Sequence, residues 1–148
     1  MKLKKFSGYT FKLRAPPQLT HYGIEDIATL RSIPNLVILS PADGLEVAKA
    51  TMAAAEYDGP VYLRLTGVMN HAIVYKEDYE FAIGKAVVIR EGPDVSIFAT
   101  GGMVSQAIKA AKTLAGQGVE CKIVNIHTIK PLDVEAVKLS LNCKLIVS

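Results

Sequence analysis

The chain has no tryptophan and very little cysteine, with only Cys121 and Cys143 among its 148 residues. The two lack the close spacing of metal ligands, which argues against a zinc site, and they are too few for a disulfide framework. Both fall in segments that are expected to be strands. We therefore expect buried free thiols, and the cytoplasm is the compartment that suits such thiols.

Long apolar runs and a large charge are also missing. No stretch approaches the roughly 18 apolar residues of a membrane-spanning helix, and the basic residues 1–5 are not followed by the apolar segment of a secretory signal. The net charge of +3 is too small to indicate nucleic-acid binding. Because half of the residues are hydrophobic, we expect a packed core and neither a membrane nor a nucleic-acid partner.

The first half of the chain predicts four elements. Residues 25–32 have the spacing of a helix, and residues 36–39 form a short apolar run typical of a parallel strand buried on both faces. Asp43 and Glu46 form a capping-box-like pair at the start of a second helix, and residues 60–65 are a second strand. Helix, strand, helix and strand with short connections predict a parallel sheet.

The second half predicts another α/β unit, after a segment at 67–80 that lacks periodicity. The expected strands are 86–89, 95–99, 119–126 and 145–147, and the expected helices follow Gly101-Gly102 and Pro131-Leu132-Asp133. The fold class is therefore α/β, in two small units with parallel or mixed sheets and flanking helices. The chain is expected to be truncated at both ends.

His21 is the strongest candidate for chemistry. It lies between Thr20 and Tyr22, directly before a predicted helix, where a neutral imidazole can exchange hydrogen bonds with a sugar hydroxyl or a carbonyl. A lone histidine in a loop is by default an ordinary surface residue. The surrounding run of residues 19–28 favours a functional role instead.

Other polar features have simpler explanations. Glu25 and Asp26 point about 100° apart on a helix, so they favour charge in its first turn over a paired-carboxylate site. Gly101-Gly102 could cradle an anion, but it lacks the full glycine-rich pattern, and close packing explains it. Neither His71 nor His127 has a second ligand at metal spacing, so no metal ligand is assigned.

Several of these runs resemble the transketolase family. The runs that resemble its pyrimidine-binding domain are residues 19–28 with Thr20-His21, residues 30–35 and residues 40–43. The stretch from Gly84 to Asp133 resembles its C-terminal domain. The resemblance implies a partial pyrimidine-binding domain at 1–66, a linker at 67–80 and a partial C-terminal-like domain at 81–148.

The resemblance implies a fragment or subunit piece of a thiamine-diphosphate-dependent transketolase, which transfers a two-carbon ketol unit between sugars. In that family the matching histidine contacts the sugar substrate, so His21 is the implied catalytic residue. The family's activating glutamate, stacking aromatic residue and metal-binding motif have no counterpart in this sequence. Thiamine diphosphate and Mg²⁺ are therefore expected only in the complete enzyme, with a diphosphate-binding domain or subunit as partner. The chain alone is expected to be inactive and to bind no cofactor.

Two departures from the family leave alternatives open. Pro17 and Gln18 stand where many relatives have an acidic residue and a glycine, and Gly67 stands where many have an arginine that grips a substrate phosphate. Glycine cannot replace that clamp, so either the substrate lacks a phosphate there or the product is not catalytic. The alternatives are a non-catalytic assembly module and a 2-oxoacid dehydrogenase β-like subunit. Because both ends of the chain look truncated, we expect at least one sheet to expose unpaired strand edges and apolar surface, which predicts a homo-oligomer, most simply a dimer.

Overall fold

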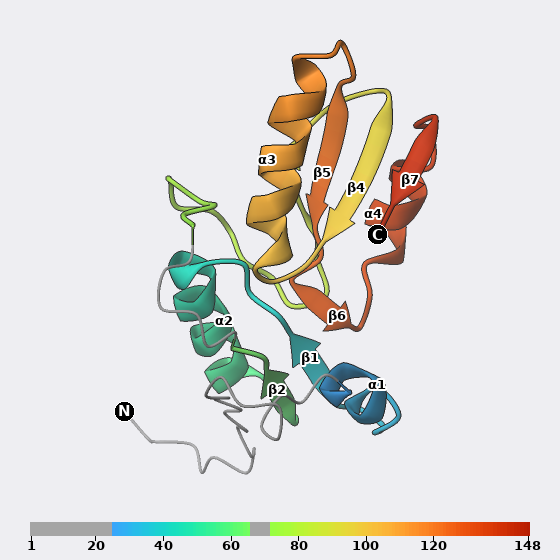
Figure 1. Ribbon diagram of the computed structural model, residues 1–148. Helices are drawn as coiled ribbons and strands as arrows, with labels where there is room; N and C mark the ends of the chain where they lie inside the picture. Colours follow the sequence, from blue (N-terminus) through green and yellow to red (C-terminus); the bar gives the residue numbers. More distant parts are fainter. Residues whose placement is uncertain (1–24, 66–71) are drawn as a thin grey trace.

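A computed structural model describes residues 25–65 and 72–148 of the chain. Within these ranges the elements fall into two sheets with flanking helices (Figure 1). In chain order they are α1 (Asp26–Leu30), β1 (Val37–Leu39), α2 (Gly44–Glu56), β2 (Val61–Leu63), β3 (Val87–Arg90), β4 (Val95–Ala99), α3 (Met103–Ala115), β5 (Cys121–Asn125), β6 (Thr128–Lys130), α4 (Val134–Leu139) and β7 (Leu145–Val147).

The smaller sheet has three strands in the order β2-β1-β6. Strand β1 runs parallel to β2, with Val37 opposite Val61, as the sequence predicts. It runs antiparallel to β6, with Ile38 opposite Lys130. The first sheet is therefore mixed, in agreement with the predicted fold class. The short connections predict its parallel pair, and the antiparallel third strand comes from the distant half of the chain.

Strand β1 is buried on both faces, which confirms the interpretation of its apolar run. Val37 and Leu39 pack toward α2, where Ala50 is fully buried. Ile38 points to the other face, which it shares with Tyr62 and with Leu30 of α1. Because neither face meets water, every residue of β1 can be apolar.

The start of α2 confirms the predicted N-cap and corrects its detail. The Asp43 carboxylate accepts a hydrogen bond from the Glu46 backbone N–H at 2.9 Å. In a capping box the Glu46 carboxylate would accept from the N-cap backbone N–H. Here it accepts instead from Ala42 N, one residue earlier, at 2.6 Å.

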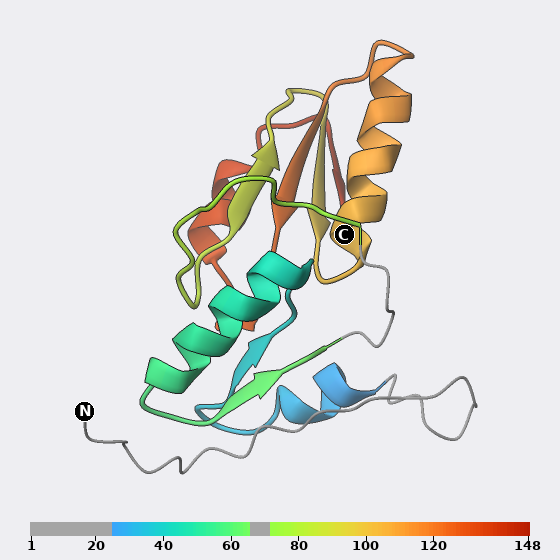
Figure 2. The same ribbon diagram turned by 90° about the vertical axis from the view of Figure 1, so that its left-hand side faces the viewer.

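The larger sheet has four strands in the order β3-β5-β4-β7. Strand β4 is parallel to both β5 and β7, whereas β3 is antiparallel to β5. The helix α3 packs on this sheet through Val104, Ala107 and Ala111, which lie on the apolar face that its sequence predicts. Figure 2 shows the sheet between α3 and α4.

The strand pairing crosses the predicted boundary between the two units. Strand β6 belongs to the second unit by sequence, yet it completes the sheet of the first. Phe81 and Ile83 likewise pack against the core around β1. The division into units at 1–66 and 81–148, joined by a linker at 67–80, therefore stays a prediction.

Two smaller expectations concern the cysteines and the helices. Cys121 is a buried free thiol on β5, as predicted. Cys143 is also a free thiol, but it is only half-buried and precedes β7, so its expected burial in a strand is wrong. Among the described residues, no helix has the length and apolar character needed to cross a bilayer.

Shortening a buried side chain of the central strand β1 should destabilise the chain strongly. Leu39 is fully buried between helix and sheet, so we expect Leu39→Ala to lower the free energy of unfolding by about 2–5 kcal/mol through lost burial and a residual cavity. Leu139 on α4 is 71% exposed, and Leu139→Ala is the matched control, expected to change it by no more than about 0.5 kcal/mol. Urea unfolding measures both, and equal losses would contradict the assigned core.

Candidate functional site

The predicted substrate contact and the missing clamp both fall outside the described residues. His21 precedes the first described residue, and Gly67 lies in the gap after residue 65. The structure does describe two elements that adjoin them in sequence. One is the start of α1, which follows His21, and the other is the end of β2, which precedes Gly67.

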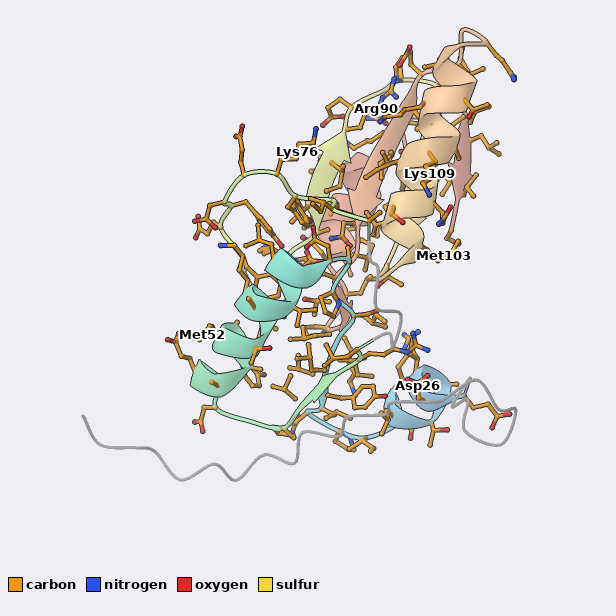
Figure 3. The ribbon with its side chains drawn as sticks, turned by 60° about the vertical axis from the view of Figure 1, so that its left-hand side comes forward. Asp26, Met52, Lys76, Arg90, Met103 and Lys109 are labelled. Atoms are coloured by element: carbon orange, nitrogen blue, oxygen red, sulfur yellow. The ribbon has the colours of Figure 1, made fainter. Side chains whose placement is uncertain are left out.

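These two elements are joined by a partly buried ion pair. Asp26, the first residue of α1, accepts a hydrogen bond through Oδ2 from Arg64 Nε at 2.7 Å. The same oxygen accepts from the Tyr62 hydroxyl at 2.9 Å. The Asp26 side chain is only 7% exposed, and Figure 3 shows it on α1 beside the end of β2.

The ionisation of the cluster follows from these contacts. Burial opposes the charge on Asp26, but hydrogen bonds from Arg64 and Tyr62 and the positive charge of Arg64 outweigh it, and the pKa of Asp26 is lowered. Burial, the hydrogen bond to Asp26 and its negative charge raise the pKa of Tyr62 to about 12. The carboxylate is therefore charged and the phenol protonated near neutral pH.

Asp26 lies in the first turn of α1, as expected, and the ion pair adds a second role to it. The sequence favoured a simple contribution of charge to the first helical turn, whereas the structure pairs Asp26 with Arg64 on a different element. Glu25 is exposed, so the two acids do diverge as predicted. The only signal for the pair was a lone arginine directly after the apolar run of residues 61–63.

A second polar cluster surrounds Glu46 of α2, which is fully buried. Besides Ala42 N, its carboxylate accepts from Asn125 Nδ2 at 2.9 and 3.0 Å. The hydroxyls of Tyr75 and Tyr79 donate to Oε1 at 3.2 and 2.6 Å. One carboxylate thus joins α2, the end of β5 and the segment that precedes β3.

The segment 74–79 is fixed to α2 at several points. Asp43 Oδ2 accepts from the backbone N–H groups of Val74 and Tyr75, both at 2.9 Å. The rings of Tyr75 and Tyr79 stack with centroids 4.2 Å apart. Burial and the neighbouring Glu46 charge raise the pKa of both phenols, so they remain protonated donors. Part of the predicted linker is therefore tightly held, which its lack of periodicity did not reveal.

His127 is buried at the same junction and acts as a structural residue. Its Nδ1 lies 3.0 Å from Thr128 Oγ1, and its ring stacks on Phe81 with centroids 4.3 Å apart. Burial lowers the pKa of His127, although the Glu46 charge opposes this, so the ring is neutral at pH 7. No metal role is needed to explain it.

The glycines before α3 are explained by close packing, as expected. Gly101 has a φ of 55°, and its N–H donates to Ser40 O at 3.1 Å. A Cβ at this position would lie 2.8 Å from Ser40 Oγ. The turn after β4 therefore sits directly against the turn after β1, and glycine is required there.

The described residues do not by themselves fit a metal–diphosphate group. Over 25–65 and 72–148 there is no group of three histidine, cysteine, aspartate or glutamate side chains that could hold a metal ion. A metal-bound diphosphate needs oxygen ligands of that kind. No reaction step is therefore assigned to such a group on these residues.

Two family profiles match the chain, one in each half. The pyrimidine-binding domain of transketolase matches residues 18–67, and the C-terminal domain of transketolase matches residues 84–147. The chain belongs to the transketolase family. The first match includes His21, and the two together contain nearly all of the elements of both sheets.

Curated relatives of this transketolase-family chain include named subunits. It is 44% identical over 119 residues to the 6-deoxy-6-sulfo-D-fructose transketolase subunit SqwH of Clostridium sp. strain MSTE9, covering 80% of this chain and 36% of that protein. It is 34% identical over 119 residues to a subunit of the apulose-4-phosphate transketolase of Phocaeicola vulgatus, covering 80% and 38%. The chain thus spans somewhat more than a third of the length of these two relatives.

A solved structure agrees with the fold of this transketolase-family chain. A split-gene transketolase, described as an inactive beta4 tetramer, matches with a TM-score of 0.79 and 36% identity. The match covers 86% of this chain and 42% of the other. The likeness therefore extends over both sheets of the chain.

The stability contributed by Asp26 should be lost at low pH. Its pKa in the folded chain lies below the ordinary value of 3.8, so the contribution is complete above about pH 4 and disappears as the pH falls through the lower, folded value. We expect Asp26→Asn to cost about 1–2 kcal/mol near pH 7 and clearly less near pH 3, where protonation of the carboxylate begins to remove the contribution. Urea unfolding at both pH values, with exposed Asp58→Asn as control, measures this. A loss independent of pH would contradict the ion pair.

Replacing the buried carboxylate should weaken the junction between the sheets. Glu46→Gln keeps the size but places an NH₂ group among donors, so at least one buried donor loses its acceptor. We expect a loss of about 2–4 kcal/mol in the free energy of unfolding. Glu56→Gln, at the exposed end of the same helix, is the matched control. Equal stability of the two variants would show that the cluster contributes nothing.

Proposed function

We propose that the chain is part of a thiamine-diphosphate-dependent transketolase that transfers a two-carbon ketol unit between sugars. The observation that carries this proposal is the order of the two family matches, with the pyrimidine-binding domain followed by the C-terminal domain. The relatives named as subunits support a protein that works with a separate partner chain.

The proposal divides the work between this chain and its partner. Thiamine diphosphate and Mg²⁺ are held in the complete enzyme by a diphosphate-binding domain or subunit. This is consistent with the described residues, which contain no group of three acidic, histidine or cysteine side chains that could hold a metal ion. The cofactor supplies the carbanion chemistry. This chain contributes His21, whose imidazole contacts the sugar and orients its hydroxyl or carbonyl group for transfer.

A second proposal concerns assembly without catalysis. The similar split-gene chain is described as an inactive beta4 tetramer, which supports self-association of such chains in the absence of a partner. We propose that this chain also forms a homo-oligomer. The exposed apolar residues of the edge strand β7, Leu145, Ile146 and Val147, are consistent with a surface that another chain could cover.

Removing the imidazole of His21 should reduce catalysis more than stability. In the complete enzyme, we expect His21→Ala to lower kcat/KM by about 10²–10³-fold, the cost of losing one well-placed hydrogen bond in a transition state. The melting temperature should stay nearly constant, because loop positions seldom carry much folding energy. His71→Ala, the substitution of another histidine of the same chain, is the control and should leave kcat/KM unchanged.

Steady-state kinetics and thermal unfolding are measured on the same preparations. Full turnover by His21→Ala would remove it from the site. A fall in melting temperature large enough to explain the lost activity would make it a structural residue. No transfer between sugars by the unmodified chain assembled with its diphosphate-binding partner would favour the assembly module.

A further inference from the structure

We propose that Asp26 is a positioning residue for the segment that carries His21, and that it acts through its shared contact with Arg64 and Tyr62. The proposal rests on the proposed function, because it assigns a catalytic consequence to the placement of His21. It concerns the direction in which the chain enters α1, and it requires no contact between Asp26 and the substrate.

The first step is that α1 is held to the described part of the chain by few contacts, namely the packing of Leu30 and polar contacts near its two ends. It is five residues long, none of its residues is fully buried, and its N-cap makes no side-chain hydrogen bond to the part of the chain that the structure describes. A helix this short is not stable by itself. Its position must therefore come from contacts to the rest of the protein.

Each end of α1 is fastened to the three-stranded sheet. Past its C-terminal end, the Lys130 ammonium on β6 donates to the carbonyl oxygens of Arg31 and Ile33. At its N-terminal end, the Asp26 carboxylate accepts from Arg64 Nε and the Tyr62 hydroxyl. Asp26 is therefore the polar anchor at the end of α1 that the His21 segment enters.

The donors that hold Asp26 are themselves fixed. Tyr62 is 3% exposed in the middle of β2, and the Arg64 backbone N–H donates to Leu39 O at 2.8 Å. Tyr62 thus lies in β2, and Arg64, directly after β2, is hydrogen-bonded to the end of β1. Because the Asp26 carboxylate is hydrogen-bonded to these two residues, the start of α1 is held at a fixed place relative to the sheet.

The Asp26 carboxylate has a second oxygen, Oδ1, that could accept a further hydrogen bond. Asp26 Oδ1 is buried and has no hydrogen-bond partner within residues 25–65 and 72–148. A buried carboxylate oxygen without a donor is costly. The start of α1 thus offers an acceptor for one further donor, while Oδ2 is already occupied.

The connection to His21 follows from the covalent chain. Asp26 follows His21 by five positions in the sequence, and five residue steps span at most about 18 Å. Because the backbone is continuous, the position of Asp26 limits where His21 can lie. A misplacement of about 1 Å at a reacting group can cost about 10²-fold in rate.

A double-mutant cycle tests the proposal in the complete enzyme, formed by this chain and its diphosphate-binding partner with thiamine diphosphate and Mg²⁺. Asp26→Asn keeps the shape of the side chain and removes its charge. We expect it to lower kcat/KM about tenfold when His21 is present, and less than about twofold in a His21→Ala background. A residue that acts through His21 has nothing left to position once the imidazole is gone.

Two further variants separate positioning from a loss of folding. Tyr62→Phe removes one of the two donors without changing charge, and should give a smaller effect of the same kind. Asp78→Asn breaks the exposed ion pair with Lys49 on α2, and should leave kcat/KM unchanged. Amide hydrogen exchange of the chain should quicken in peptides covering residues 15–30 of Asp26→Asn, and stay constant in α3.

The outcomes distinguish this proposal from the function on which it rests. An equal effect of Asp26→Asn in both backgrounds, or no effect in either, overturns the positioning role and leaves His21 in place. Faster exchange throughout the chain also overturns it, because the pair is then only a general stabiliser. If His21→Ala itself leaves kcat/KM unchanged, the site assignment fails and the positioning role fails with it.

Discussion

The carboxylate of Glu46 is the contact on which the junction between the two sheets depends. A buried carboxylate needs donors, and here they come from α2's own start, from Asn125 at the end of β5 and from two tyrosines of the segment before β3. No positive side chain pairs with Glu46 among the described residues, so neutral donors and the N-terminus of α2 stabilise the charge. Because the donors come from both halves of the chain, satisfying this one group brings the sheets together.

A second buried carboxylate, that of Asp26, has a related task at the other end of the smaller sheet. It ties a short helix to the end of β2, and the segments next to both elements in sequence contain His21, the proposed substrate contact, and Gly67. The two carboxylates differ in their partners. Asp26 faces an arginine that is about one-third exposed, and Glu46 is fully enclosed by neutral groups. The Asp26 pair therefore holds a helix near the protein surface, whereas the Glu46 cluster connects the two sheets from the interior.

Local pattern predicted the elements well, because each depends on near neighbours in sequence. The apolar run of β1, the Asp43 cap and the apolar face of α3 all follow from rules that span four residues or fewer. The pairing of β6 with β1 and the bond from Asn125 to Glu46 join residues far apart in the chain, and nothing in the local pattern specifies them. The candidate role of His21 as a substrate contact could be predicted only from the family resemblance, since a Thr-His pair before a helix occurs in many proteins without that role. Arg64 was missed because an arginine beside an apolar strand is equally compatible with an exposed end.

The most direct test of the functional account is calorimetric titration with thiamine diphosphate and Mg²⁺, carried out on this chain alone and then on the chain mixed with a diphosphate-binding transketolase subunit. If the chain supplies the pyrimidine-binding and C-terminal parts of a shared site, the chain alone gives no measurable binding heat and the mixture binds the cofactor with one site per pair of chains. Clear micromolar binding by the chain alone would contradict the account, because the cofactor ligands would then lie within this chain.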